Sequence, residues 1–189
     1  MAYQFKTYHK KILADTLTPV SVYLKIRDRF PNSILLESSD YHANDNSFSY
    51  ICCNPIASIK IENETVIKNF PDGTTEEFSI DKGTNVVEII DAFSKAFKAD
   101  ENDFKFINNG LFGYMAYDAV RYFEDVNLTV KEDSIQIPDI YYAVYQNIIA
   151  INHFKNEAYL FAHCYEADNN IPELEQLLNI RNFATYNFK

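Results

Sequence analysis

The distribution of apolar positions along the chain predicts short strands interspersed with a few amphipathic helices. Runs of β-forming residues, several with alternating apolar and polar positions, occur at residues 33–38, 48–53, 56–61, 65–70, 74–80, 104–112, 140–154 and 158–165. Turn-forming sequences separate some of these runs, namely Asn63-Glu64, Pro71-Asp72-Gly73 and Asn156-Glu157. The turns predict a meander over residues 48–80 and a hairpin over residues 140–165.

Helical periodicity marks four further stretches, at residues 18–30, 86–97, 114–124 and 172–178. Thr18 is a suitable N-cap for the first helix, with Pro19 at its first helical position, and Asn85 followed by Glu88 is typical of a capping box before the second. The residues expected to form the apolar stripe of the first helix are Val20, Leu24, Ile26 and Phe30. Because this order lacks regular βαβ alternation, we expect an α+β fold with a largely antiparallel sheet and packed helices.

The composition favours one globular domain. The chain has 189 residues, of which 47% are hydrophobic, enough to bury a core. Its net charge of −10 without a basic patch argues against a nucleic-acid partner, because phosphates would be repelled. No run approaches 18 apolar residues and the start lacks a secretory signal, so we expect no membrane partner. The three cysteines, an odd number, fit a reducing compartment, and we expect a cytoplasmic protein.

The sequence contains no common motif of hydrolytic or metal chemistry. The four histidines are not spaced as metal ligands, and neither G-x-S-x-G nor a phosphate-binding G-x-x-x-x-G-K-S/T occurs. Cys52, Cys53 and Cys164 are expected to be small buried residues of strands. The pair Glu76-Glu77 is expected on an exposed hairpin edge.

The tetrapeptide Leu35-Leu36-Glu37-Ser38 places a carboxylate directly after an apolar run. A buried charge must be paired, so one interpretation is a small pocket in which Glu37 meets an ammonium group and Ser38 adds a hydrogen bond. The other interpretation is a strand end that reaches water, with Ser38 closing a turn. The four residues leave both interpretations open.

A second candidate is the segment of residues 110–124, which holds half of the four glycines of the chain. On the expected helix, Tyr114 and Tyr117 share a face, and Asp118 and Arg121 are spaced to pair. This pattern indicates either a ligand or domain-contact surface, or a packing motif with a local ion pair.

Taken in order, five segments resemble anthranilate synthase component I. They are residues 18–24, residues 35–38, residues 47–51 with Asn54-Pro55, residues 110–124 and residues 137–140. The resemblance extends over about residues 5–165, and the related aminodeoxychorismate synthase component I shares most of the pattern. Each motif is short, but their order and spacing together make the resemblance specific.

The resemblance implies an enzyme that converts chorismate, with ammonia or with glutamine through a partner amidotransferase subunit, into anthranilate and pyruvate. In the family, chorismate and a magnesium ion are held by the carboxy-terminal half of the chain. Residues 1–189 then correspond to a single amino-terminal regulatory domain, with the catalytic chorismate-binding domain absent. We therefore expect no catalytic residue, no metal ligand and no cofactor in this chain.

The resemblance also implies a feedback site for tryptophan in the amino-terminal domain. The residues that match it are Leu36, Glu37, Ser38, Phe48 and Ser49. The residues expected to face the catalytic carboxy-terminal domain are Tyr114, Tyr117, Asp118 and Arg121. The alternatives are the same domain of aminodeoxychorismate synthase, in the folate pathway, and a free-standing small-molecule sensor domain.

Overall fold

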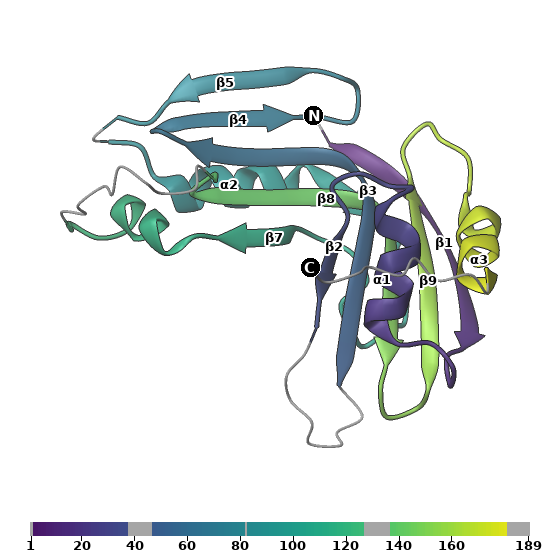
Figure 1. Ribbon diagram of the computed structural model, residues 1–189. Coiled ribbons are helices and arrows are strands. Elements are labelled where there is room, and N and C mark those ends of the chain that lie inside the picture. The colour runs from purple at the N-terminus through teal and green to yellow at the C-terminus, as the bar shows by residue number, and fades with distance from the viewer. Residues whose placement is uncertain (1, 38–46, 82, 127–136, 181–189) are drawn as a thin grey trace. The chain divides into compact units, whose positions relative to one another are not determined.

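A computed structural model describes residues 2–37, 47–81, 83–126 and 137–180 (Figure 1). The chain divides into two compact units. The first unit comprises Met1–Tyr3, Ile56–Lys98 and Gly110–Val144, and the second comprises Gln4–Pro55, Ala99–Asn109 and Tyr145–Lys189. Several strands continue from one unit into the other.

The strands are β1 (Tyr3–Leu13), β2 (Ile34–Leu36), β3 (Phe48–Glu62), β4 (Thr65–Asn69), β5 (Thr75–Ser79), β6 (Phe97–Ala99), β7 (Phe112–Met115), β8 (Ile140–Asn152) and β9 (Glu157–Cys164). Their hydrogen-bonded order is β5-β4-β3-β8-β9-β1-β6, with β2 paired to β3 and β7 paired to β8. The pairings β1–β9, β2–β3, β3–β4, β4–β5, β7–β8 and β8–β9 are antiparallel. The expected α+β fold with a largely antiparallel sheet is confirmed.

The first unit contains the predicted meander from Ile56 onward. The β3–β4 turn places Asn63 and Glu64 at positive φ, which suits a two-residue hairpin connection. Alternation along β3 buries Ile59 and Ile61, as the sequence predicts. β5 is exposed along its length, including the predicted edge pair Glu76-Glu77.

The second unit has its own apolar core. Helices α1 (Pro19–Arg27) and α3 (Ile171–Asn179) contact each other and pack on residues from β3, β8 and β9. The buried residues include Val22, Ile26, Ile51, Cys53, Ile149, Leu160, Leu174 and Leu178. All three cysteines are buried and free, as expected. Burial raises the pKa of the Cys53 thiol to about 12, so this cysteine stays protonated at neutral pH.

Local capping signals set the starts of two of the predicted helices. Thr18 and Ser21 form a reciprocal capping box at α1, with Pro19 at its first position. Asn85 caps α2 (Val86–Lys95) by accepting from the backbone N–H groups of Val87 and Glu88. The predicted stripe of α1 is wrong in part, because its buried residues are Pro19, Val22 and Ile26. Val20 is 48% exposed.

Two predictions of secondary structure between residues 104 and 124 are wrong. The expected strand at residues 104–112 is a loop until β7 begins at Phe112. The expected helix at residues 114–124 is the end of β7 followed by a 3-10 helix, η1 (Tyr117–Tyr122). Tyr114 and Tyr117 therefore do not share a helix face. Pairing of β7 with β8, which lies 25 or more residues later, overrides the local helical periodicity.

The first strand, β1, was not predicted. Its sequence YQFKTYHKKIL mixes exposed and half-buried positions, and only Phe5 is buried. The strand is held by a continuous antiparallel register with β9, from Lys6 opposite Cys164 to Leu13 opposite Glu157. Among the described helices, none combines the length and the apolar character that crossing a bilayer requires.

Candidate functional site

The predicted tryptophan-site residues come from two segments that lie side by side in the second unit. β2 and β3 pair antiparallel, with Leu35 opposite Ile51 and Leu36 opposite Tyr50. The chain continues from Leu36 into Glu37, and it enters Tyr50 from Ser49. Both segments therefore meet at the same end of the β2–β3 pair, although about ten residues separate them in sequence.

The carboxylate of this group lies at the surface. Glu37 is exposed, and Leu36 keeps 37% of its surface accessible. Ser38 lies outside the described residues. The strand therefore reaches water at Glu37, as one of the two interpretations of the tetrapeptide holds, and the carboxylate does not need a buried partner.

Ser49 faces the interior. Its side chain is fully buried, and its Oγ lies 2.7 Å from Nε2 of His153. The backbone N–H of His153 also donates to the carbonyl of Ser47, at 3.0 Å. These two hydrogen bonds connect the start of β3 to the residue that follows β8. Sequence reasoning did not single out His153, because nothing in its local spacing indicates a partner 104 residues away.

Phe48 joins the site to a third segment. Its ring stacks on Phe106 with centroids 4.6 Å apart and on Tyr50 with centroids 6.1 Å apart. Burial raises the pKa of Tyr50, and a backbone hydrogen bond from Ile107 opposes the shift. The segment of residues 99–109 therefore touches the start of β3 at two aromatic side chains. No motif in the sequence indicated this segment as part of a site.

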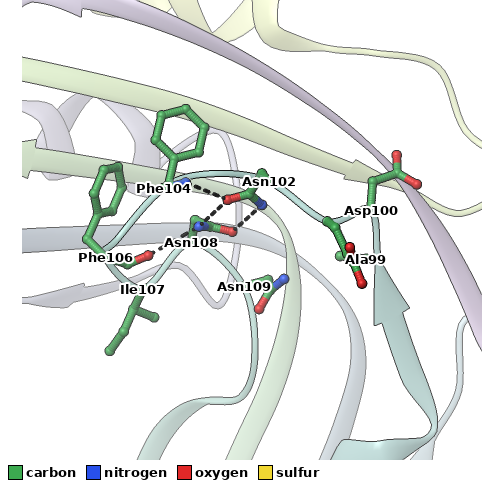
Figure 2. Close-up of a pocket in the computed structure, with 9 residues that line it drawn as sticks. Ala99, Asp100, Asn102, Phe104, Phe106, Ile107, Asn108 and Asn109 are labelled. Atoms are coloured by element: carbon green, nitrogen blue, oxygen red, sulfur yellow. Dashed lines mark hydrogen bonds between the residues drawn. The ribbon is translucent and has the colours of Figure 1, made fainter.

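The 99–109 segment lines a shallow cavity of about 520 Å³ that is open to solvent (Figure 2). Its lining residues are Ala99, Asp100, Glu101, Asn102, Phe104, Phe106, Ile107, Asn108 and Asn109. Figure 2 shows the side chains of Asn102 and Asn108 turned toward each other at the centre of the loop. Their amides exchange two hydrogen bonds of 3.0 and 3.1 Å.

The predicted domain-interface residues lie on β7 and η1 of the first unit. Tyr114 is 41% exposed and Tyr117 is 85% exposed, and Asp118 is also exposed. Asp118 and Arg121 are paired at 3.9 Å. The nearer partner of Arg121 is Asp139, at 3.1 Å. Two tyrosines and one carboxylate thus face outward, while Arg121 holds η1 in place.

Asp139 anchors η1 through two side chains. It accepts from Arg121 Nη2 and, at 2.7 Å, from the hydroxyl of Tyr122. Burial, and then the hydrogen bond to Asp139, raise the pKa of Tyr122 to about 12. The phenol therefore remains a donor at every physiological pH. Sequence reasoning missed both Tyr122 and Asp139, since their pairing spans 17 residues and depends on the β7–β8 register.

Within the described ranges, no group of three or more His, Cys, Asp or Glu side chains is placed to hold a metal ion. The side chains that line the 99–109 cavity include aromatic rings, amides and carboxylates. Such a set can bind a small organic molecule by stacking and hydrogen bonding.

Comparison with known proteins gives the family. The sequence profile described as chorismate binding enzyme matches residues 32–186. Anthranilate synthase component 1 of Lactococcus lactis is 32% identical over 154 residues, which are 80% of this chain and 31% of that protein. Aminodeoxychorismate synthase component 1 of Bacillus subtilis is 28% identical over 163 residues, which are 81% of this chain and 32% of that protein.

A solved structure shares the fold. Anthranilate synthase component I from Streptococcus pneumoniae superposes with a TM-score of 0.50 at 22% identity, over 90% of this chain and 35% of that chain. The chain spans about a third of the length of the curated relatives that it matches. Because the profile match covers more than half of the chain, the protein belongs to the family of chorismate binding enzymes.

Proposed function

We propose that this chain is the regulatory, non-catalytic part of an anthranilate synthase component I, the enzyme that converts chorismate into anthranilate for tryptophan biosynthesis. In this proposal, catalysis and the magnesium ion belong to a carboxy-terminal catalytic domain. Ammonia comes from a glutamine amidotransferase subunit, and tryptophan acts on this chain as the feedback inhibitor. The similarity to anthranilate synthase component 1 of Lactococcus lactis supports the enzyme class.

The observation that carries the tryptophan site is the β2–β3 pairing. It sets Leu36 opposite Tyr50 and so gathers Leu36, Glu37, Phe48 and Ser49 at one end of a strand pair. Glu37 is exposed there and is available to accept from the ammonium or the indole N–H of tryptophan. Leu36 and the Phe48 stack offer apolar surface for the ring.

Ser49 has a different role in this proposal. Its hydroxyl is buried and bonded to His153, so it holds the start of β3 rather than meeting the ligand. Ser38 supplies the polar contact next to Glu37. The open, half-exposed character of Leu36 and Glu37 fits one wall of a pocket whose second wall comes from the catalytic domain.

Inhibition then follows from a shift between two states of the enzyme. Tryptophan inhibits only if it binds more tightly to the state in which the chorismate site is poor. Residues of the tryptophan site set how much more tightly tryptophan binds to that state, and they do so without touching chorismate. Tyr114, Tyr117 and Asp118, exposed on β7 and η1, form the face toward the catalytic domain, and Arg121 positions that face.

The test uses the active enzyme that contains this chain and measures turnover of chorismate against tryptophan concentration. We expect Ser38→Phe and Glu37→Gln to raise the half-inhibitory tryptophan concentration by about tenfold or more, which corresponds to about 1.4 kcal/mol of lost binding. Turnover without tryptophan should stay within about twofold, because the sensing residues do not touch chorismate. Glu77→Gln on the exposed strand β5 is the matched control and should leave inhibition unchanged. Unchanged inhibition in both site variants would show that the site is misassigned.

A second candidate function is the corresponding part of aminodeoxychorismate synthase. The 28% identity to the Bacillus subtilis aminodeoxychorismate synthase component 1 supports this second function. The two functions differ in the product, so the same turnover assay separates them. Release of anthranilate supports our proposal, and accumulation of aminodeoxychorismate without sensitivity to tryptophan supports the alternative.

A further inference from the structure

The cavity of the 99–109 segment has the volume of a small-molecule site, although it is open to solvent. Its volume of about 520 Å³ falls within the range of ligand pockets, and all of its lining residues belong to the second unit. The lining combines two phenylalanines with amide and carboxylate side chains. None of these residues is among those we assign to the tryptophan site.

The cavity is held in shape by bonds that the loop makes to itself and to the sheet. Asn108 is buried and exchanges amide hydrogen bonds with Asn102. Its carbonyl lies 2.7 Å from Nε2 of the buried His163, on β9. The rings of Phe104 and Phe106 pack on Phe161, with centroids 5.2 and 6.1 Å away. A ligand therefore meets a preformed frame and does not have to order the loop.

The charge of the lining selects the kind of ligand. Asp100 and Glu101 line the cavity, and no Lys or Arg does. Asp100 Oδ2 accepts from the backbone N–H of Thr7 at 2.8 Å. Asp100 also contributes, after Tyr8, to raising the pKa of Lys6. Among the residues that the structure describes, no hydrogen bond or ion pair engages Glu101. Lys6 therefore offsets part of the charge of Asp100, whereas the carboxylate of Glu101 stays available to a cation.

The hydrogen bonds already made in the cavity limit which ligand groups can bind there. Asn102 Oδ1 accepts from both Phe104 N and Asn108 Nδ2, and Asn108 Nδ2 also donates to the carbonyl of Phe106. The side-chain amides of Asn102 and Asn108 are thus bonded to each other and to the backbone of the loop. The carboxylate oxygens of Asp100 and Glu101 only accept, so a ligand group that binds at these two residues must be a donor.

We propose that this cavity binds a small organic ammonium compound, with its ammonium group at Glu101 and Asp100 and its apolar part against Phe104 and Phe106. This inference stands apart from the proposed tryptophan site, since it uses none of the same residues. Phe106, against which the ligand lies in this proposal, also stacks on Phe48 at the start of β3.

The test titrates the chain with three probes that share one ring and differ in charge: 2-phenylethylamine, 2-phenylethanol and phenylacetate. Nuclear magnetic resonance follows the side-chain amides of Asn102 and Asn108. We expect saturable shifts with the amine, binding at least about threefold weaker with the alcohol, and none with the carboxylate. Equal binding of amine and alcohol, binding of phenylacetate, or no saturable shift with the amine would overturn the proposal.

Two variants test whether the carboxylate of Glu101 binds the ammonium group. Glu101→Gln should raise the dissociation constant of 2-phenylethylamine about three- to fivefold, the size expected for one exposed ion pair. Asp103→Asn removes the same charge from the same loop but from a residue that does not line the cavity, and it should leave the constant unchanged. Equal weakening in both variants would show only a general attraction to the acidic chain and would refute the site. Circular dichroism confirms that each variant is folded.

Discussion

His163 links three segments of the second unit through one buried imidazole. It is 2% exposed, its Nδ1 lies 3.0 Å from Thr7 Oγ1 on β1, and its Nε2 lies 2.7 Å from the carbonyl of Asn108. A carbonyl only accepts, so Nε2 carries the proton of the neutral ring and Nδ1 accepts from the threonine hydroxyl. A second proton on Nδ1 would reverse this bond, so that the ring donates to Thr7 Oγ1, and it would place a positive charge on a buried ring.

The stability of the fold should therefore fall in mild acid. Burial lowers the pKa of His163 below its ordinary 6.5, against smaller opposing effects of Asn108 and Asp100. Between the two pKa values the unfolded chain binds a proton that the folded chain does not, so the free energy of unfolding decreases as the pH falls through about 6.5. Denaturation at a series of pH values from 7.5 to 5 measures the slope.

The matched variants for this effect are His163→Gln and His9→Gln. His163→Gln removes the buried titrating ring, so the slope between pH 7.5 and 5 should become shallower. His9 is an exposed histidine of β1, and His9→Gln is the control that should keep the slope. A His163→Gln variant with the slope of the parent protein would contradict the assignment.

At the scale of elements, Gly113 allows β7 to lie against β8. It pairs with Tyr142, and a Cβ built on it would lie 1.9 Å from the carbonyl oxygen of Tyr141. Only a residue without a side chain fits this approach. The helical periodicity of residues 114–124 does not reveal the constraint, since the close contact comes from a strand far along the chain.

Gly113→Ala should weaken the β7–β8 pairing. The added methyl group must push the two backbones apart, so we expect the free energy of unfolding to fall by about 2 kcal/mol or more. Gly83→Ala is the control, because its Cβ would lie at an ordinary 3.7 Å from Asp81 Oδ1. Chemical denaturation measures both, and equal stability of the two variants would argue against the close approach.

The starts of α1 and α2 and the β3–β4 turn were predictable because their signals are local. Thr18, Asn85 and the pair Asn63-Glu64 act through backbone groups within three residues of themselves. β1 was missed because its polar side chains mask a strand that the register with β9 holds in place.

At the scale of the whole molecule, Tyr117 is a large side chain that the fold itself does not use. It is 85% exposed on η1. Tyr117→Ala should therefore change the free energy of unfolding of this chain by no more than about 0.5 kcal/mol. Tyr122→Phe, on the same helix, loses the bond to Asp139 and should cost about 1 kcal/mol.

The same substitution tests the proposed domain face. In the active enzyme, Tyr117→Ala should lower the thermal midpoint or shift tryptophan inhibition, since our proposal packs the tyrosine on the catalytic domain. Differential scanning calorimetry of the enzyme and of this chain alone provides the comparison. A variant that leaves both proteins unchanged would show that Tyr117 does not form the contact.

The candidate site was predictable only in part. The tetrapeptide at residues 35–38 and the segment at residues 47–51 could be identified from their resemblance to anthranilate synthase component I. Whether Glu37 is buried could not be read from its apolar neighbours, and the structure places it at the surface. The partners of Ser49 and Phe48 depend on residues about 60 to 100 positions away, which no local pattern reports.

The sequence by itself determined the α+β class, the starts of α1 and α2 and the β3–β4–β5 meander, because these follow from caps, turns and alternation within a few residues, and the burial of the cysteines follows from their apolar character. Only the tertiary structure decided the pairing of β7 with β8, the Ser49–His153 bond and the cavity of the 99–109 segment. Each of these depends on the distance in space between residues that are far apart in the chain, and local hydrophobic patterns do not contain that distance.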